Sequence, residues 1–256
     1  MKTSRQRREP EKTLSVVNGR RMHARVSGGR AADGQPVVLV HGLVVSGRYM
    51  VPLLNELARS HAVYVPDLPG FGRSEGPAHA LDAAGLADAL AAWMRAAGLG
   101  GAALVGNSVG CQVIVELALR HPGLVESAVL QGPTMDRRAR SAPRQIWRLL
   151  VDTTREPASL VAIEGLDLLR AGVGRSWRTF RHALGDPIEE KLPNVRVPAL
   201  VVHASRDRIS PKNWAEEVAR LLPGGRLIVL TRAAHAANYS APAEFARAVR
   251  SFLADR

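Results

Sequence analysis

The pentapeptide Gly106-Asn107-Ser108-Val109-Gly110 constrains this chain more than any other segment. An apolar run typical of a strand, residues 102–105, precedes it, and a helix-compatible run, residues 111–120, follows it. A serine between glycines at such a junction stands on a sharp turn, because only small neighbours let the two backbone segments approach each other. The helix that begins there also directs its first N–H groups toward the serine. Ser108 is therefore a candidate nucleophile.

Two further polar residues follow strand-like runs later in the chain. Asp207 comes just after the apolar run 199–203, and His235 comes just after the run 226–231. A serine, an aspartate and a histidine, each past the carboxyl end of a different strand, can form a catalytic triad. We predict Ser108 as nucleophile, His235 as general base and Asp207 as the acid that orients it. The rival acid would follow the run 125–131, where Asp136 is the first carboxylate.

This chain order resembles that of the α/β-hydrolase superfamily, and the resemblance extends from about Leu14 to the C-terminus. Residues 37–43 look like the family's strand that ends in His-Gly, and residues 64–74 are similar to its strand-end turn. The resemblance implies that the backbone amides of Leu43 and Val109 form the oxyanion hole. It also implies a structural role for His41 and no cofactor.

The alternation of apolar runs and helix-like segments predicts an α/β fold: a mostly parallel eight-stranded sheet with helices on both faces. Asn18-Gly19 predicts a hairpin, so the first two strands should be antiparallel. Strands are expected near residues 14–17, 22–26, 37–41, 62–66, 102–106, 125–131, 198–203 and 226–231, and helices near 49–60, 80–97, 109–121, 211–222 and 241–254.

Residues 133–192 interrupt this alternation with helical patterning at the point where the family inserts a cap. We therefore predict a hydrolase core over residues 1–132, a helical cap or lid over 133–192, and the rest of the core over 193–256. Within the first part, residues 1–12 should form a disordered basic tail.

Some residues near the predicted site are candidates for substrate contacts. Asn107 precedes the nucleophile, and Trp147 and Trp177 are large apolar side chains of the predicted cap, although cap packing is the simpler role for its apolar residues. The cap also holds a basic cluster that would bind a carboxylate if it faced the pocket and would otherwise be a solvated helix face. The cluster comprises Arg137, Arg138, Arg140, Arg144 and Arg148.

Composition narrows the possible partners and location. The net charge of +12 suggests weak attraction to polyanions, but no nucleic-acid-binding motif is present and only 4% of residues are aromatic. The histidines lack metal-ligand spacing, so no metal is predicted. No apolar leader or spanning segment is readable, and Cys111 is the single cysteine. A cytoplasmic monomer or homodimer without membrane insertion is expected.

These features favour a serine hydrolase that cleaves a carboxylic ester of a small molecule through an acyl-enzyme. A carbon-carbon bond hydrolase of the meta-cleavage-product type is the first alternative, because those enzymes also have asparagine before the serine. Against it, Ala236 follows His235 where they commonly have tryptophan, and the loop after Gly42 is not glycine-rich. A thioesterase, a lactonase and a catalytically silent receptor or scaffold are the remaining alternatives.

Overall fold

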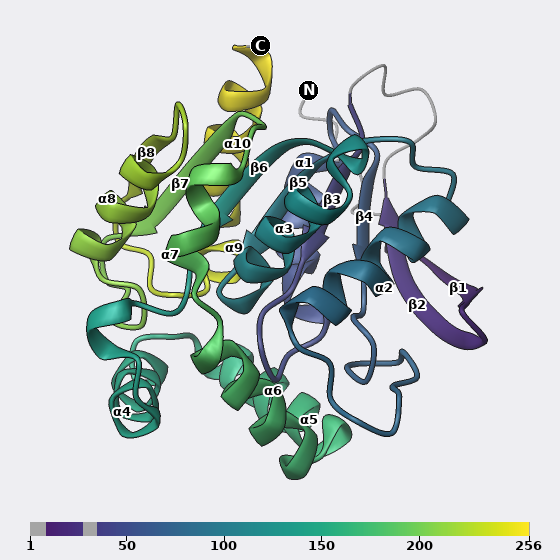
Figure 1. Ribbon diagram of the computed structural model, residues 1–256, viewed down its shortest axis with the longest axis horizontal. Helices are drawn as coiled ribbons and strands as arrows, with labels where there is room; N and C mark the ends of the chain where they lie inside the picture. Colours follow the sequence, from purple (N-terminus) through teal and green to yellow (C-terminus); the bar gives the residue numbers. More distant parts are fainter. Residues whose placement is uncertain (1–8, 28–34, 256) are drawn as a thin grey trace, which may run out of the picture.

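The computed structural model describes residues 9–27 and 35–255, and these residues form one eight-stranded sheet flanked by helices (Figure 1). The predicted fold class is confirmed. Of the predicted basic tail, residues 1–8 lie outside the described residues, whereas Glu11 and Lys12 belong to the first strand. The strands are β1 (Glu11–Val17), β2 (Arg20–Ser27), β3 (Val37–Val40), β4 (Val63–Pro66), β5 (Ala102–Asn107), β6 (Val125–Gln131), β7 (Ala199–Ala204) and β8 (Arg226–Leu230).

The strands lie in the order β1-β2-β4-β3-β5-β6-β7-β8. β2 pairs antiparallel with β1 and β4, and every later pairing is parallel. Asn18 and Gly19 have φ values of 50° and 74°, which is the positive φ that the predicted tight hairpin requires. The parallel strands β3, β5 and β7 are buried along their whole length, as expected for a sheet covered on both faces.

Helices cover the two faces of the sheet and divide the core into two apolar layers. In Figure 1, α2 and α3 lie in front of the sheet, and α1 and α10 lie behind it. Asp82 caps α2 by accepting a hydrogen bond from Gly85 N, as a residue at a helix start should. The core helices are α1 (Val51–Leu57), α2 (Ala83–Ala96), α3 (Val109–Arg120), α8 (Lys212–Leu221), the short α9 (Ala237–Ser240) and α10 (Pro242–Ala254).

The segment between β6 and β7 is helical. Its main helices gather at the lower end of the molecule in Figure 1, beyond the carboxyl ends of the parallel strands. Proline in the first turn of α4 fits the predicted helix start at Ser141. The backbone N–H groups of a first turn have no intrahelical acceptor, so a proline there removes no hydrogen bond. The helices are α4 (Ala142–Thr153), α5 (Ala158–Ala171), α6 (Val173–Gly185) and the short α7 (Ile188–Lys191).

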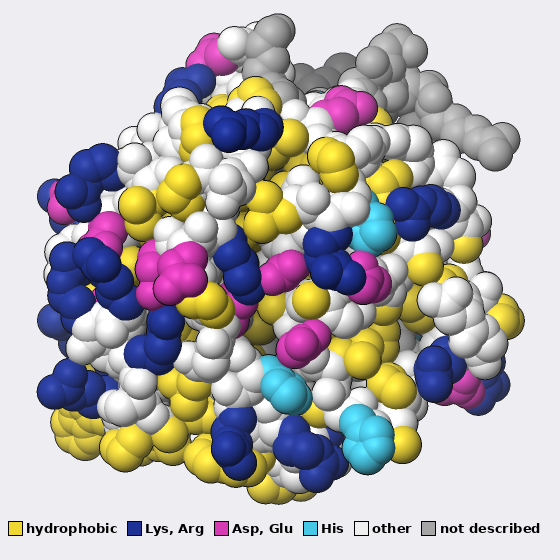
Figure 2. All heavy atoms as spheres, viewed as in Figure 1, with side chains coloured by type: hydrophobic (Ala, Val, Ile, Leu, Met, Phe, Trp, Pro, Cys, Tyr) yellow, Lys and Arg dark blue, Asp and Glu magenta, His cyan; other side chains and the backbone are white. Residues whose placement is uncertain are grey.

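No helix in the described ranges is both long enough and apolar enough to cross a membrane. On the face shown in Figure 2, lysine and arginine side chains are scattered among acidic and apolar ones. Cys111 is fully buried behind the turn that carries Ser108, as a small core residue would be, and burial raises the pKa of its thiol.

Candidate active site

Ser108 stands on a strained turn between β5 and α3. Its φ of 58° and ψ of −123° lie outside the regions that ordinary residues occupy, and such strain is kept where the surroundings enforce it. The flanking glycines make the turn possible. A Cβ on Gly106 would lie 2.7 Å from the Ile114 side chain, and one on Gly110 would lie 2.4 Å from the Val40 carbonyl oxygen. The tight packing of α3 against β5 and β3 therefore explains the glycine spacing read from the sequence.

His235 and Asp207 meet at the carboxyl ends of neighbouring strands. His235 Nδ1 lies 2.8 Å from Asp207 Oδ2, and Asp207 Oδ1 accepts hydrogen bonds from the backbone N–H groups of Ile209 and Ser210, both 2.8 Å. Burial alone would lower the pKa of the His235 imidazole. The charge and hydrogen bond of Asp207 outweigh burial, and the pKa rises to about 9. Asp136, the rival acid, instead pairs with Arg148 at 3.0 Å.

Gly132, directly after β6, lies against this His–Asp pair. Its φ is 55°, and a Cβ there would lie 2.9 Å from Asp207 Oδ2 and 3.0 Å from two ring atoms of His235. Only glycine fits this close approach without displacing the pair.

The loop after β3 approaches Ser108 closely, since a Cβ on Gly42 would lie 3.2 Å from Ser108 Cβ. Val44 has a φ of 67°, a strained conformation for a β-branched residue, and Leu43 lines the same cavity as Ser108. Val109 is the first residue of α3, where a backbone N–H has no intrahelical acceptor. His41 donates from Nδ1 to the Gly42 carbonyl and accepts at Nε2 from Leu68 N, both at 2.8 Å, so it ties this loop to the turn after β4.

Asn107 reaches the cavity, but its amide group is fully engaged by the protein. Its Oδ1 accepts from the Tyr49 hydroxyl at 2.6 Å, and its Nδ2 donates to Gln131 Oε1 and to the His235 carbonyl at 3.0 Å. Gln131 Nε2 donates to the same carbonyl at 2.8 Å. The polar atoms of Asn107 therefore hold the backbone of the histidine loop, and only its apolar surface is left to meet a substrate.

Carboxylates of the insertion accept hydrogen bonds from the backbone of the loops around Ser108. Asp152 in α4 is buried and accepts from Arg208 N at 2.9 Å and from His235 N at 3.3 Å. Glu156 accepts from Ala236 N at 2.6 Å. Asp167 in α5 accepts from the backbone N–H and the hydroxyl of Ser46, at 2.9 and 2.7 Å. The insertion is thus bonded to all three loops around Ser108.

A cavity of about 370 Å³ opens above Ser108 and is mainly apolar. Its floor comes from the catalytic loops, and its roof comes from single stripes of α4 and α5 together with one residue of α6. The floor includes Gly42, Leu43, Val44, Val45, Tyr49, Asn107, Ser108, Val109, Thr134, Met135, Ile209, His235 and Ala236; the roof includes Gln145, Leu149, Thr153, Val161, Glu164, Gly165, Leu168 and Phe180.

The two predicted tryptophan contacts lie outside this lining. Trp147 is 68% exposed on α4, which turns Leu149 toward the cavity instead. Trp177 is 46% exposed and packs against Phe180, whose ring does line the cavity. Apolar side chains are also visible along the lower edge of Figure 2, where the inserted helices lie in Figure 1.

None of the five arginines of the basic cluster is among the residues that line the cavity. Arg137 and Arg138 both pair with Glu217 at 2.7 Å, Arg140 pairs with Glu189, and Arg148 pairs with Asp136. Arg144 donates to the Arg138 carbonyl at 3.0 Å. The structure therefore fits the solvated-face interpretation of this cluster.

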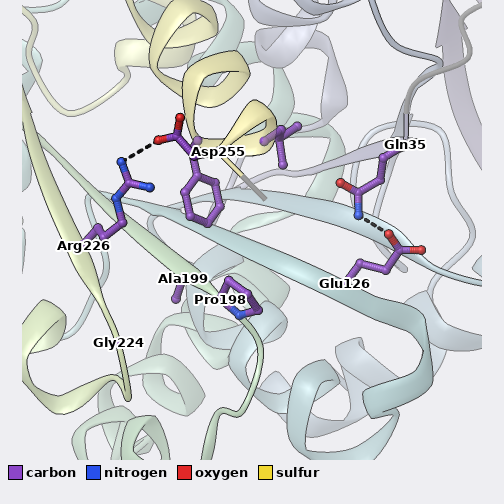
Figure 3. A pocket seen from close by; sticks show the side chains of 9 residues that line it. Gln35, Glu126, Pro198, Ala199, Gly224, Arg226 and Asp255 are labelled. Atoms are coloured by element: carbon purple, nitrogen blue, oxygen red, sulfur yellow. Dashed lines mark hydrogen bonds and ion pairs between the residues drawn. The ribbon is translucent and has the colours of Figure 1, made fainter.

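A larger hollow of about 620 Å³ lies at the amino ends of β7 and β8 (Figure 3). Its polar side chains bond to one another: Arg226 pairs with Asp255 at 2.9 Å, and Gln35 donates to Glu126. None of its lining residues belongs to the loops that carry Ser108, Asp207 and His235, so this larger hollow is separate from the cavity above Ser108. Over residues 9–27 and 35–255, no three histidine, cysteine or carboxylate side chains are grouped to hold a metal ion.

The sequence did not indicate Gly132, Gln131, Asp152, Glu156 or Glu164 as site residues. Gly132 had a local signal, since glycine next to a strand end often permits close approach. The three carboxylates had no local sequence signal. Asp152 and Glu156, for example, contact backbone about 80 residues further along the chain, at His235 and Ala236.

The fold and this arrangement at the strand ends agree with the comparisons to known proteins. The model of the alpha/beta hydrolase family matches residues 37–248, and the chain belongs to this family. A pyrrolizixenacetamide deacetylase of Xenorhabdus hominickii is 28% identical over 86% of this chain and 91% of its own. A pimeloyl-[acyl-carrier protein] methyl ester esterase of Neisseria meningitidis serogroup B is 28% identical over 85% and 92%.

Solved structures show the same fold. A thermophilic esterase from Thermogutta terrifontis superposes with a TM-score of 0.80 at 23% identity, covering 96% of this chain and 98% of that one. At this identity the likeness concerns the fold alone.

Proposed function

We propose that this protein is a serine hydrolase that cleaves a carboxylic ester through an acyl-enzyme, with Ser108, His235 and Asp207 as its triad. The observation that carries the proposal is the 2.8 Å contact between His235 Nδ1 and Asp207 Oδ2 beside a serine held at a φ of 58°. The names of the two relatives, a deacetylase and a methyl ester esterase, both denote acyl transfer to water.

In the proposed reaction, neutral His235 takes the proton of Ser108 as the serine oxygen attacks the acyl carbon. Asp207 holds the imidazole by Nδ1 and stabilises the imidazolium that forms. The N–H groups of Leu43 and Val109 donate to the oxyanion, an interaction typically worth ~3 kcal/mol per donor. His235 returns the proton to the leaving alcohol and then activates the water that releases the acid.

The insertion, residues 133–192, serves in this proposal as a cap. Its side chains Leu149, Val161, Leu168 and Phe180 line the cavity above Ser108 and would bury the apolar parts of a substrate. Burial of apolar surface contributes ~25 cal/mol per Å², and these roof side chains extend the apolar surface that the floor already offers. A closed roof also keeps water away from the oxyanion before the acyl-enzyme forms.

The proposal is tested with purified wild type and Ser108→Ala on p-nitrophenyl acetate and butyrate. Loss of the nucleophile should lower kcat on the order of a million-fold, because the remaining groups cannot form an acyl-enzyme. A serine-directed phosphonate should label the wild type once, at Ser108. The exposed Ser251 of α10 gives the matched control, and Ser251→Ala should keep full activity.

Thermal unfolding of both variants checks that each is folded. Turnover by folded Ser108→Ala close to that of wild type, or phosphonate labelling at another residue, would show that Ser108 is not the nucleophile.

A further inference from the structure

The side chains that line the cavity above Ser108 do not share the basic excess of the whole chain. The chain carries 35 basic and 23 acidic residues, yet no lysine or arginine is among the described residues that line this cavity. Glu164 of α5 is the one carboxylate in the lining. It shares a helix stripe with Val161, Gly165 and Leu168, so an acidic group stands within an otherwise apolar part of the roof.

The Glu164 carboxylate is not used by the fold. Within the described part of the chain, no group donates a hydrogen bond to it and no cation pairs with it, in contrast to Asp152, Glu156 and Asp167 on the same insertion. It lies half-buried beside apolar neighbours. Burial raises the pKa of Glu164, the field of His235 opposes that rise, and the field of Asp152 adds to it. A partly desolvated carboxylate without a partner is costly, and a ligand cation would remove that cost.

We propose that Glu164 is a specificity-determining residue that selects esters carrying a cationic group, such as a quaternary or protonated amine, and disfavours esters carrying a second carboxylate. This inference rests on the proposed ester hydrolysis and names its substrate class. The apolar stripe around Glu164 suits the methyl or methylene groups of such a cation. Four arginines of the insertion are paired with other carboxylates, and none of its arginines is among the described residues that line the cavity.

The test uses pairs of esters that have the same shape and differ in charge. On the acyl side, p-nitrophenyl 4-(trimethylammonio)butyrate is compared with its carbon isostere, p-nitrophenyl 5,5-dimethylhexanoate. On the alcohol side, butyrylcholine is compared with 3,3-dimethylbutyl butyrate. The measured quantity is the ratio of kcat/KM for the cationic ester to that for its neutral isostere. Taking the same ratio in wild type and variant cancels the intrinsic reactivity of the esters.

Glu164→Gln should lower this ratio about tenfold or more for at least one pair, because opposite charges a few ångströms apart in a partly desolvated site interact by more than the energy of a tenfold change. The same variant should raise kcat/KM for the anionic p-nitrophenyl glutarate monoester, a gain that a misfolded protein cannot show. Glu190→Gln, at an exposed position of α7 outside the cavity, makes the same charge change and should leave every ratio unchanged.

A second readout separates this inference from the proposed function. The dissociation constants of both members of each pair are measured on Ser108→Ala with and without Glu164→Gln. If wild type cleaves no ester, the proposed function fails, while the dissociation constants still report whether Glu164 binds the cation. Equal ratios in wild type and Glu164→Gln, together with equal dissociation constants, would overturn the assignment of Glu164.

Discussion

His235 lies in the electrostatic field of three carboxylates. Asp207 contacts it directly, and Asp152 and Glu156 add to the same field from the insertion. Despite complete burial, which disfavours the charged form, these carboxylates raise the pKa of the imidazole to about 9. In the proposed reaction these carboxylates would stabilise the imidazolium of the transition state, and they also make the free base scarce at neutral pH.

The pH dependence of hydrolysis follows from this balance. Only the neutral imidazole can accept the Ser108 proton, so kcat/KM for p-nitrophenyl butyrate should rise about tenfold per pH unit below the pKa and level off near pH 9. Asp207→Asn should remove the main charge that raises the pKa, shift this limb to lower pH and reduce kcat on the order of ten thousand-fold. A wild-type limb centred at or below pH 6.5 would show that the carboxylates do not govern the base.

At the scale of elements, α4 connects the two loops that carry the acid and the base. The two oxygens of Asp152 accept from Arg208 N in the acid loop and from His235 N in the histidine loop. One buried side chain therefore fixes the distance between the loops as well as adding to the charge around the imidazole. Asp152 is a positioning residue, since it reaches the reaction only through these backbone groups.

Asp152→Asn should lower kcat about ten- to a hundredfold with a smaller effect on KM, because an amide can accept only one of the two N–H groups and small displacements of catalytic groups are costly. The lost charge should also move the rising limb of the pH profile to lower pH. Steady-state kinetics across pH provide both readouts. Asp82→Asn, at an exposed cap where asparagine serves equally well, is the matched control. An unshifted limb with unchanged kcat would contradict this role.

The sequence predicted elements better than it predicted which faces of the helices point inward. Strands ended within a residue or two of their predicted positions, because apolar runs and turn residues are local signals. Ser108, Asp207 and His235 could be predicted to lie at one edge of the sheet because each comes within five residues after the end of a strand. In α4 one broad apolar face includes both Trp147 and Leu149, so periodicity could not show that Leu149 lines the cavity while Trp147 lies outside it. Contacts such as Asp152 with His235 depend on packing between distant segments.

At the scale of the whole molecule, Asp67 joins parts of the sheet and loops that are far apart in sequence. Its carboxylate bonds to His23 and Arg25 of β2, to Gly47 N after β3 and to Arg73 N in the following turn, all within 3.0 Å. Burial would raise the pKa of Asp67. The hydrogen bond with His23 and the charge of Arg25 outweigh burial and lower the pKa to about 2.

Asp67→Asn should reduce the free energy of unfolding at pH 7 by roughly 3 kcal/mol, because Arg25 loses its buried partner. Since the folded pKa is lowered, the stability that Asp67 contributes is present above its unfolded pKa of ~3.9 and is lost as pH falls toward 2. Urea unfolding of wild type and variant between pH 7 and pH 3 measures the difference, which should narrow below pH 4. A difference independent of pH would mean that the carboxylate charge contributes nothing.

The hydrogen bonds that Asp152, Glu156 and Asp167 accept from the three loops around Ser108 also bear on how this fold can be re-engineered. A chimera that exchanges residues 133–192 for the insertion of a relative would change more than the shape of the pocket. It would leave the backbone N–H groups of Ser46, Arg208, His235 and Ala236 without acceptors, unless the relative's insertion carried carboxylates at matching places. In this protein, new substrate preferences are therefore better sought by changing single roof residues than by grafting whole caps.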